Sequence, residues 1–342
     1  MEDKVPQYDY QMGSRVDEKE HPLHQGRLIP LCSKCGVKPS IYFRPYSGER
    51  LCKRCFIDSI IFRVERTISR FNMFKFDSRI AVAVSGGKDS LNLLRVLCRL
   101  EETYPKTELI VASVDEGIKD YRDEALKFVK KSCKQYDIEL QVLSFKELYG
   151  FTLDEIVEKT EDKDLTPCSY CGVLRRRALN EIARRIDADL LATAHNLDDV
   201  VQTMLLNLMR GDLNRLSSAY PVSTGVQGLV RKVKPFCEVP ERESAMLAYL
   251  TEIEFQSIPC PYSERAMRND IRRFINMMEA KRPGIMFTIY RSSLKLISSR
   301  LATNGEKTRF CELCNEPSQT KICRTCELLR ELTDDRSEIL NN

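Results

Sequence analysis

Six consecutive residues, Ser85-Gly-Gly-Lys-Asp-Ser90, carry the groups that bind a phosphate. Gly86 and Gly87 let the backbone approach an anion closely and adopt unusual dihedral angles. Lys88 supplies a positive charge, the two serines supply hydroxyl donors, and Asp89 could hold a Mg²⁺ ion that bridges phosphates. The Walker pattern Gly-x-x-x-x-Gly-Lys-Ser/Thr is absent here, so the stretch predicts a different phosphate loop; an ordinary Gly-Gly turn is the alternative.

The chain also holds 14 cysteines, ten of which form five Cys-x-x-Cys pairs. No signal peptide is evident, so we expect an intracellular protein with reduced thiols, where such pairs argue for metal rather than disulfides. Two pairs separated by 16 residues, and two more separated by eight, predict two structural Cys₄ zinc sites, because four thiolates leave no open position. The ligands are Cys32, Cys35, Cys52 and Cys55 in the first site, and Cys311, Cys314, Cys323 and Cys326 in the second.

The fifth pair, Cys168 and Cys171, cannot complete a zinc site alone. It could form a redox pair, a catalytic pair or part of a cluster. Cys260 lies between two prolines, which favour an extended turn, and is a candidate third ligand for the pair; an isolated buried thiol is the alternative. Of the other single cysteines, Cys98 and Cys133 are expected in helix cores and Cys237 has no assigned role.

Alternating strands and helices must position these residues. Apolar runs predict buried strands at 80–84, 109–114, 138–144 and 189–194, and helices are expected at 56–76, 91–97, 121–136 and 200–209. Such alternation predicts an α/β fold, a doubly wound parallel sheet with both faces covered. Ligands then bind beyond the carboxyl ends of the strands. We therefore expect residues 85–90, 115–117 and 195–199 to converge at one edge.

Charged residues near this edge suggest further roles. Asp198 and Asp199 open a predicted helix, so one can be a cap, while the other is a candidate metal ligand or general base. Residues 175–177 are three arginines at an expected helix start, and they suit the phosphates of ATP or of a nucleic acid. Residues 261–300 contain nine Arg or Lys but only three acidic residues, and this excess of positive charge favours a polyanion-binding surface. Solvated charge is the alternative in both places.

In order, the motifs are a zinc knuckle, SGGKDS, VDEGI, CxxCGVLRRRAL, TAHNLDD, a lone cysteine between prolines, basic helices and a second zinc knuckle. This order resembles that of the tRNA 2-thiolation enzymes, which include the eukaryotic cytosolic wobble-uridine thiolation protein and its archaeal and bacterial relatives. They are PP-loop, or N-type, ATP pyrophosphatases with an adenine nucleotide alpha hydrolase-like fold. The resemblance covers about residues 30 to 330.

The resemblance implies site residues by motif. It assigns ATP, with Mg²⁺, to the loop Ser85–Ser90 and an acidic catalytic position to Asp199. It makes Cys168, Cys171 and Cys260 the ligands of a [4Fe–4S] cluster whose fourth iron lacks a protein ligand. The remaining nucleotide contacts are Val84, Asp115, Arg175 and Ala194; some relatives carry Lys at position 175, and Arg there suits phosphate contact but not a base role.

The implied activity is that of a tRNA uridine 2-sulfurtransferase. ATP adenylates the C2 oxygen of a uridine, with position 34 favoured and position 54 possible, and pyrophosphate leaves. Sulfide, or sulfur from a ubiquitin-like carrier protein, then displaces AMP to give 2-thiouridine. A persulfide on Cys168 and Cys171 could replace the cluster in this reaction. Another PP-loop adenylating ligase acting on tRNA, or a non-catalytic zinc protein that binds RNA, are the alternatives.

The expected domain organisation follows the same order. Residues 1–30 are expected to form a flexible arm, 31–60 the N-terminal zinc knuckle and 61–230 the ATP-binding catalytic domain. Residues 231–305 would form a helical, basic tRNA-binding part, and 306–330 the C-terminal zinc knuckle. We expect a cytoplasmic protein without a membrane segment, assembled as a homodimer or with a heteromeric partner.

Overall fold

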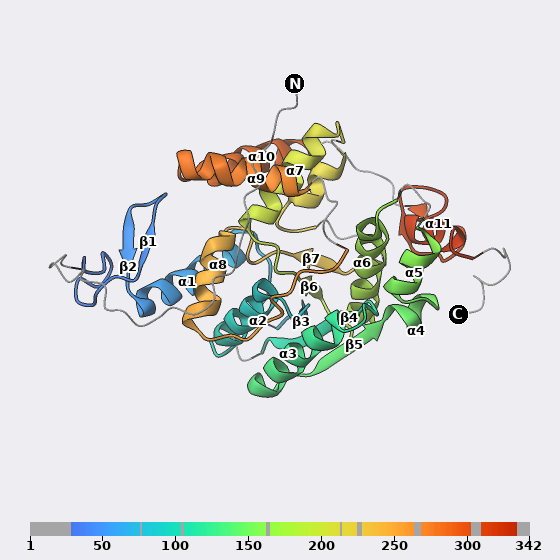
Figure 1. Cartoon of the computed structure of the whole chain (residues 1–342), viewed down its shortest axis with the longest axis horizontal. Coiled ribbons are helices and arrows are strands. Elements are labelled where there is room, and N and C mark those ends of the chain that lie inside the picture. Colours follow the sequence, from blue (N-terminus) through green and yellow to red (C-terminus); the bar gives the residue numbers. More distant parts are fainter. Residues whose placement is uncertain are drawn as a thin grey trace, which may run out of the picture.

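A parallel sheet organises the protein (Figure 1). The computed structural model describes residues 29–75, 77–103, 106–161, 165–212, 214–223, 228–262, 268–301 and 309–333. The arm expected over residues 1–30 lies outside these ranges, apart from its last two residues. Within them, five parallel strands are ordered β5-β4-β3-β6-β7. These are β3 (Arg79–Ala83), β4 (Glu108–Asp115), β5 (Leu140–Ser144), β6 (Leu190–Ala192) and β7 (Arg231–Val233).

The strand order places a switch point at β3. From β3 the chain moves outward through β4 to β5, and it then returns to the other side of β3 as β6 and β7. In doubly wound sheets, ligands bind at the carboxyl edge where the strand order reverses. The turns that follow β3 and β6 therefore face one another at this edge. Those turns contain Ser85–Gly87 and His195–Asn196.

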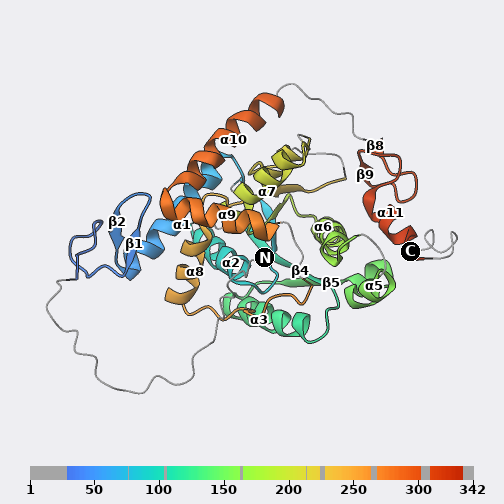
Figure 2. The same cartoon turned by 45° about the horizontal axis from the view of Figure 1, so that its top comes forward.

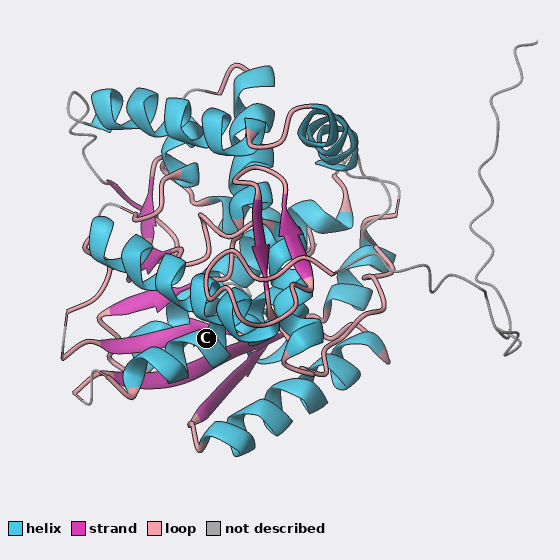
Figure 3. Cartoon of the chain, turned by 90° about the vertical axis from the view of Figure 1, so that its left-hand side faces the viewer, coloured by secondary structure: helices cyan, strands magenta, loops and turns pink. Residues whose placement is uncertain are grey.

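Apolar side chains on alternating positions fill both faces of the sheet, as the period of a strand requires. In β3, Ile80 and Val82 pack into one core, and Ala81 packs into the other. Helices cover both faces (Figure 3). One face is covered by α1 (Lys53–Arg70), α2 (Lys88–Glu101), α3 (Tyr121–Tyr136), α7 (Leu197–Met209) and α8 (Glu241–Leu250). The other is covered by α4 (Phe145–Tyr149), α5 (Leu153–Lys159), α6 (Pro167–Arg185) and α11 (Arg324–Arg330).

Peripheral elements surround this framework. The basic helices α9 (Arg268–Lys281) and α10 (Ile285–Leu301) pack on α7 (Figure 2). The first cysteine group lies beside the hairpin of β1 (Tyr42–Arg44) and β2 (Glu49–Leu51), with two cysteines before it and two after it, the last of them in α1. The second group lies around β8 (Arg309–Phe310), β9 (Pro317–Ser318) and the start of α11. The two groups lie at opposite sides of the molecule (Figure 1).

Two features differ from the sequence prediction. Strand β7 was not predicted, because its sequence, Arg-Lys-Val, contains only one apolar residue and so lacks the apolar run of a buried strand. As an edge strand, it can form with a single buried side chain. The arginines at 175–177 lie in the middle of α6 and not at a helix start. The helix begins eight residues earlier than Arg175, at Pro167, whose fixed backbone suits the first helical position. None of the described helices is long and apolar enough to cross a membrane.

Candidate active site at the carboxyl edge of the sheet

The loop Ser85–Ser90, called the nucleotide loop below, has the geometry of an anion site. Gly86 has a φ of +90°, and a Cβ there would lie 2.5 Å from the carbonyl oxygen of Ala125, so only glycine fits. The Ser90 hydroxyl donates to the Gly87 carbonyl at 2.8 Å and braces the turn. No side chain caps α2, so its first backbone N–H groups keep their capacity for an anion.

Lys88 lies among acidic side chains beside this loop. Its Nζ lies 2.8 Å from Asp89 Oδ2 and 3.2 Å from Glu241 Oε1. The other oxygen of Asp89 is buried without a hydrogen-bond partner in the described part of the chain. Burial raises the pKa of Asp89, although Lys88 opposes the shift, and the charge of Asp199 raises it further. A buried carboxylate oxygen without a partner and a neighbouring carboxylate fit the oxygen ligands that Mg²⁺ prefers.

The two aspartates after β6 have different surroundings. Asp199 forms a capping box with Asn196, whose side chain accepts from the Asp199 N–H at 2.9 Å. Arg268 of α9 lies 3.7 Å from Asp199, and burial raises the pKa of Asp199. Asp198 instead accepts a hydrogen bond from the Glu241 backbone N–H at 2.7 Å, and burial raises its pKa to about 6. Asp198 thus anchors the start of α8, and Asp199 is the carboxylate whose charge reaches the nucleotide loop.

Three cysteines from two distant segments meet near the same edge. Cys168 and Cys171 lie at the start of α6, and the Cys168 Sγ donates to the carbonyl of Tyr262, 94 residues away, at 3.4 Å. The Tyr262 hydroxyl is fixed by Asp154 at 2.7 Å. Tyr262 lies two residues after Cys260, and Cys260 packs against the same core as Cys171, so the three cysteines belong to one region. Their sulfur atoms are not among the groups of the described residues that lie within 4.8 Å of one another. A thiol set with exposed Cys168, half-buried Cys260 and buried Cys171 fits the thiolate ligands of an iron–sulfur cluster.

Arg175 and Glu116 connect these cysteines to the sheet. The Arg175 Nη2 donates to Cys171 Sγ at 2.8 Å, and its Nε lies 2.7 Å from Glu116 Oε1. Burial raises the pKa of Cys171 to about 11, and the guanidinium opposes this shift. Glu116 is buried and also pairs with Arg122 at 3.1 Å. Sequence reasoning missed Glu116, whose only signal was its place next to Asp115 at a strand end.

A group of cations gathers around the ends of β6 and β7, and we call it the basic cluster. Desolvation and the nearby cations together lower the pKa of His195, so its ring is neutral at neutral pH. Burial also lowers the pKa of Lys234 to about 8. No ion pair of Arg176 or Lys232 is present among the described residues. The cluster comprises the cations Arg176, Lys232, Lys234 and Arg268, which surround the neutral ring of His195. Crowded cations with so few acids favour an anionic ligand.

The four sulfurs of each predicted knuckle converge. In both groups, all sulfur atoms lie within 4.8 Å of one another, so each group could hold a metal ion. Against the effect of burial, backbone N–H groups of Cys35, Cys52 and Lys34 lower the pKa of Cys32 to about 6. The Cys326 thiol lowers the pKa of Cys323 to about 5. Thiolates are the form that ligates metals. The other members are Cys55, Cys311 and Cys314.

Comparison with known proteins places the chain in a family. The model of the PP-loop domain matches residues 61–279. The cytoplasmic tRNA 2-thiolation protein 1 of Chlamydomonas reinhardtii is 39% identical over 306 residues, which cover 88% of this chain and 85% of the relative. The chain belongs to the PP-loop family of tRNA 2-thiolation proteins. A probable sulfurtransferase of Methanocaldococcus jannaschii is 37% identical over 311 residues, 90% of this chain and 89% of the relative.

Two further matches cover the cysteine-containing parts of this thiolation protein. The N-terminal LIM domain of the 2-thiouridine synthetase TtuA matches residues 31–57, the first knuckle. Among solved structures, the U34-tRNA thiolase NcsA from Methanococcus maripaludis, with its [4Fe–4S] cluster, has a TM-score of 0.76 and 34% sequence identity. The match covers 87% of this chain and 94% of that one. The α/β fold is thus that of the family, and the first cysteine group matches a domain of a family member.

The remaining predicted nucleotide contacts of the thiolation protein lie at strand ends. Val84 directly follows β3, and Ala194 lies two residues beyond β6. Asp115 ends β4, and its Oδ1 accepts a hydrogen bond from the Gly117 N–H at 2.9 Å. Arg175 is already engaged by Glu116 and Cys171. Its contact with ATP phosphate stays a prediction.

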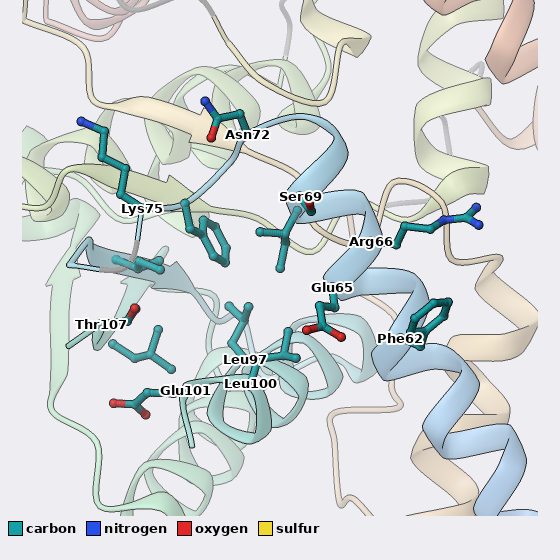
Figure 4. Close-up of a pocket in the computed structure, with 14 residues that line it drawn as sticks. Phe62, Glu65, Arg66, Ser69, Asn72, Lys75, Leu97, Leu100, Glu101 and Thr107 are labelled. Atoms are coloured by element: carbon teal, nitrogen blue, oxygen red, sulfur yellow. The ribbon is translucent and has the colours of Figure 1, made fainter. Parts of the chain in front are cut away.

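A pocket of about 530 Å³ lies away from these residues (Figure 4). It is formed by α1, the end of α2 and the first residues of β3 and β4, so it opens at the edge opposite the nucleotide loop. None of the predicted site residues of the thiolation protein lines it. Its wall includes Phe62, Ile68, Phe74, Ile80, Leu97 and Leu109.

Proposed function

We propose that this protein is an ATP-dependent tRNA uridine 2-sulfurtransferase. It would adenylate the C2 oxygen of a tRNA uridine and replace that oxygen by sulfur, with position 34 as the favoured target and position 54 as a further one. The observation that carries the proposal is the convergence of a phosphate-binding loop and three cysteines at one edge of the sheet, within one chain of short contacts from Ser85 to Cys171.

The nucleotide loop would hold the phosphates of ATP. Backbone N–H groups at the start of α2 and the Lys88 ammonium would stabilise the negative charge that develops on the leaving pyrophosphate. Lys88 is now paired with Asp89 and Glu241, so phosphate would compete with these carboxylates for it. Mg²⁺ would be held by Asp89, whose second carboxylate oxygen has no hydrogen-bond partner among the described residues, and Asp199 would be left for proton transfer.

The chemistry would run in two balanced steps. In the first, the uridine C2 oxygen attacks the α-phosphorus, a carbon–oxygen–phosphorus link forms, and the bond to the β-phosphate breaks to release pyrophosphate. Asp199, with its raised pKa, is the candidate base for the uridine N3 proton. In the second step, hydrosulfide adds to C2, AMP leaves with the former C2 oxygen, and N3 regains a proton.

Cys168, Cys171 and Cys260 would hold a [4Fe–4S] cluster, which supplies one iron without a protein ligand as a place for sulfide to bind. The protein's own contribution is to place these three thiolates. Arg175 holds Cys171 through its guanidinium, and the Tyr262 carbonyl holds Cys168. The sulfur would come from sulfide or from a ubiquitin-like carrier protein. Exposed Cys168 leaves a persulfide on the pair as the alternative carrier.

The basic cluster and the basic helices α9 and α10 would hold the tRNA backbone. The cluster stands next to Asp199, so a strand bound there would bring its uridine toward the nucleotide loop. Contacts to phosphates fix position without reading sequence. The two cysteine knuckles would each hold one Zn²⁺ with a structural role. Cytoplasmic location, and assembly as a homodimer or with a heteromeric partner, belong to the same proposal.

A reaction with purified components tests the function. The anaerobically prepared protein, ATP, Mg²⁺, sulfide and unmodified tRNA should yield 2-thiouridine, with one AMP and one pyrophosphate for each sulfur inserted. Nucleoside mass spectrometry measures the product, and a tRNA with cytidine at position 34 reports the site. Adenylation without sulfur insertion would favour a ligase of the same fold, and no nucleotide turnover would favour a non-catalytic RNA-binding protein.

A further inference from the structure

A continuous set of short contacts joins the nucleotide loop to the cysteines. The Arg122 guanidinium donates to the Ser85 carbonyl, and its third nitrogen lies 3.1 Å from Glu116. The second oxygen of Glu116 lies 2.7 Å from Arg175, which reaches Cys171 at 2.8 Å. The two outer links are hydrogen bonds from guanidinium groups, which are among the stronger ones in proteins. The two inner links are ion pairs, and the one between Arg122 Nε and Glu116 has no hydrogen-bond geometry.

Burial makes the centre of this set stiff. Arg122 is 3% exposed and Glu116 is 5% exposed, so the Arg122 charge depends on Glu116 for compensation, whereas Glu116 is paired with both Arg122 and Arg175. Arg122 is also fixed by the Ser113 hydroxyl at 2.6 Å, and that hydroxyl donates to the Val84 carbonyl at 2.7 Å. The two carbonyls that open the nucleotide loop are therefore held by one guanidinium and its immediate partner.

A second contact ties the loop to the other cysteine segment. The Gly86 carbonyl accepts a hydrogen bond from the backbone N–H of Gln256 at 2.9 Å. Gln256 lies four residues before Cys260, and its side chain is anchored on α3 through the Tyr121 carbonyl and Glu124. A shift of the loop would thus reach Cys171 through side chains and Cys260 through the backbone.

We infer that Glu116 is a positioning residue that couples occupancy of the nucleotide loop to the cysteine site, through Arg122 on one side and Arg175 on the other. The inference rests on the proposed function. Phosphate bound to the loop moves its carbonyls, Arg122 follows Ser85, and Glu116 follows Arg122 because the buried Arg122 charge has no other acidic partner among the described residues. The hydrogen bond from Arg175 to the Cys171 sulfur then changes in length or direction. ATP binding would in this way prepare the sulfur site.

The test measures the accessibility of one thiol in the reduced full-length chain, with its knuckle metals in place and no iron. The rate at which iodoacetamide alkylates Cys171 is followed by peptide mass spectrometry, with and without saturating AMP-CPP, an ATP analogue that resists cleavage after the α-phosphate. In the unaltered protein the analogue should change this rate by about fivefold or more, the size of a modest coupling between sites.

We call the contacts from Ser85 to Cys171 the relay, and two variants interrupt it at different residues. Glu116→Gln removes the central charge but leaves Arg122 buried without compensation, so it is at risk of unfolding. Arg175→Met leaves the Glu116–Arg122 pair intact and is the safer variant, because the Arg175 side chain is 44% exposed. At a saturating analogue concentration, both variants should lose the response. Arg185→Met, on the same helix and paired only with Glu181 among the described residues, should keep it.

The possible results distinguish a failure of the inferred coupling from a failure of the proposed enzymatic function. Persistence of the full response in Arg175→Met would mean that the nucleotide shields the thiol directly, and it would overturn the inference. Calorimetric binding of AMP-CPP without any change in alkylation would overturn the relay and leave the proposed function standing. Failure of the unaltered protein to bind AMP-CPP at all would overturn both.

Discussion

Arg44 and Glu243, 199 residues apart, form a buried two-pronged ion pair with distances of 3.1 and 2.9 Å. Arg44 belongs to the first cysteine knuckle, and Glu243 belongs to α8, two residues after the Glu241 that pairs with Lys88. The pair thus fastens the knuckle to the helix that contacts the nucleotide loop. Arg63 of α1 adds a further contact to Glu243 at 3.1 Å.

Glu243→Gln should lower the free energy of unfolding by roughly 3 kcal/mol, because it removes the buried carboxylate that Arg44 and Arg63 share and leaves Arg44 only the half-exposed Glu49. Urea unfolding followed by circular dichroism measures the change. Glu49 also contacts Arg44 but is 44% exposed, so Glu49→Gln is the matched control and should cost less than about 1 kcal/mol. Equal losses in the two variants would contradict the anchoring role of Glu243.

Lys88→Ala and Asp89→Ala should lose adenylation, since each removes a charge that would position the phosphates. Release of pyrophosphate in the presence of tRNA is the measurement, and a loss of about a hundredfold or more is expected for such a contact. Lys131→Ala removes a lysine that pairs only with surface Glu254 in the described chain, and it should behave as the unaltered protein does. Normal pyrophosphate release in both loop variants would contradict the assignment of Lys88 and Asp89 to the binding of ATP phosphates.

Replacing Cys32 or Cys311 by Ser should lower the zinc content and the stability of the protein, because metal binding contributes directly to the folding of such sites. Elemental analysis should show the loss of about one zinc per chain in each variant. Cys98→Ser, in the last turn of α2, should retain all the zinc. Unchanged zinc in both knuckle variants would show that the two groups are only neighbouring thiols.

Changing Cys168, Cys171 or Cys260 to Ala should abolish both the broad visible absorption of the anaerobic protein and tRNA thiolation, while ATP binding survives. The reason is that each cysteine would supply one of three cluster ligands. Cys133→Ala, on the buried side of α3, should keep the absorption. If Cys260→Ala retains full cluster content and activity, the persulfide on Cys168 and Cys171 becomes the better explanation.

Lys232→Ala and Arg176→Ala should each weaken tRNA binding and reduce the slope of log affinity against log salt by about 0.7 to 1, as expected for one lost phosphate contact. Lys234 adds a pH dependence. Its pKa is lowered to about 8, so it is charged below that pH and should lose its attraction for RNA as the pH rises through it. Filter binding at several salt concentrations and pH values measures both effects. Lys234→Met should abolish the pH dependence, and Arg185→Met should change neither quantity.

Local pattern determined much of this protein. The strand at Ile80, the turn at Gly86 and the helix after it depend on apolar spacing and on a glycine that no other residue can replace, so the sequence alone predicted them. The cysteine pairs of the two knuckles are equally local, because each Cys-x-x-Cys presents two sulfurs together. Asp199 could be singled out because it follows a strand that ends at the ligand edge.

Only the tertiary structure decided which charges pair. Glu116 and Glu243 are two of the 50 acidic residues in the chain, and both are buried against arginines. Their neighbours in sequence do not distinguish them from carboxylates that are exposed to solvent. Arg175 could be expected at phosphate, but the fold turns its guanidinium toward Cys171. These pairings depend on how segments that are remote in sequence pack together. A charge can be buried only where the fold places an opposite charge beside it.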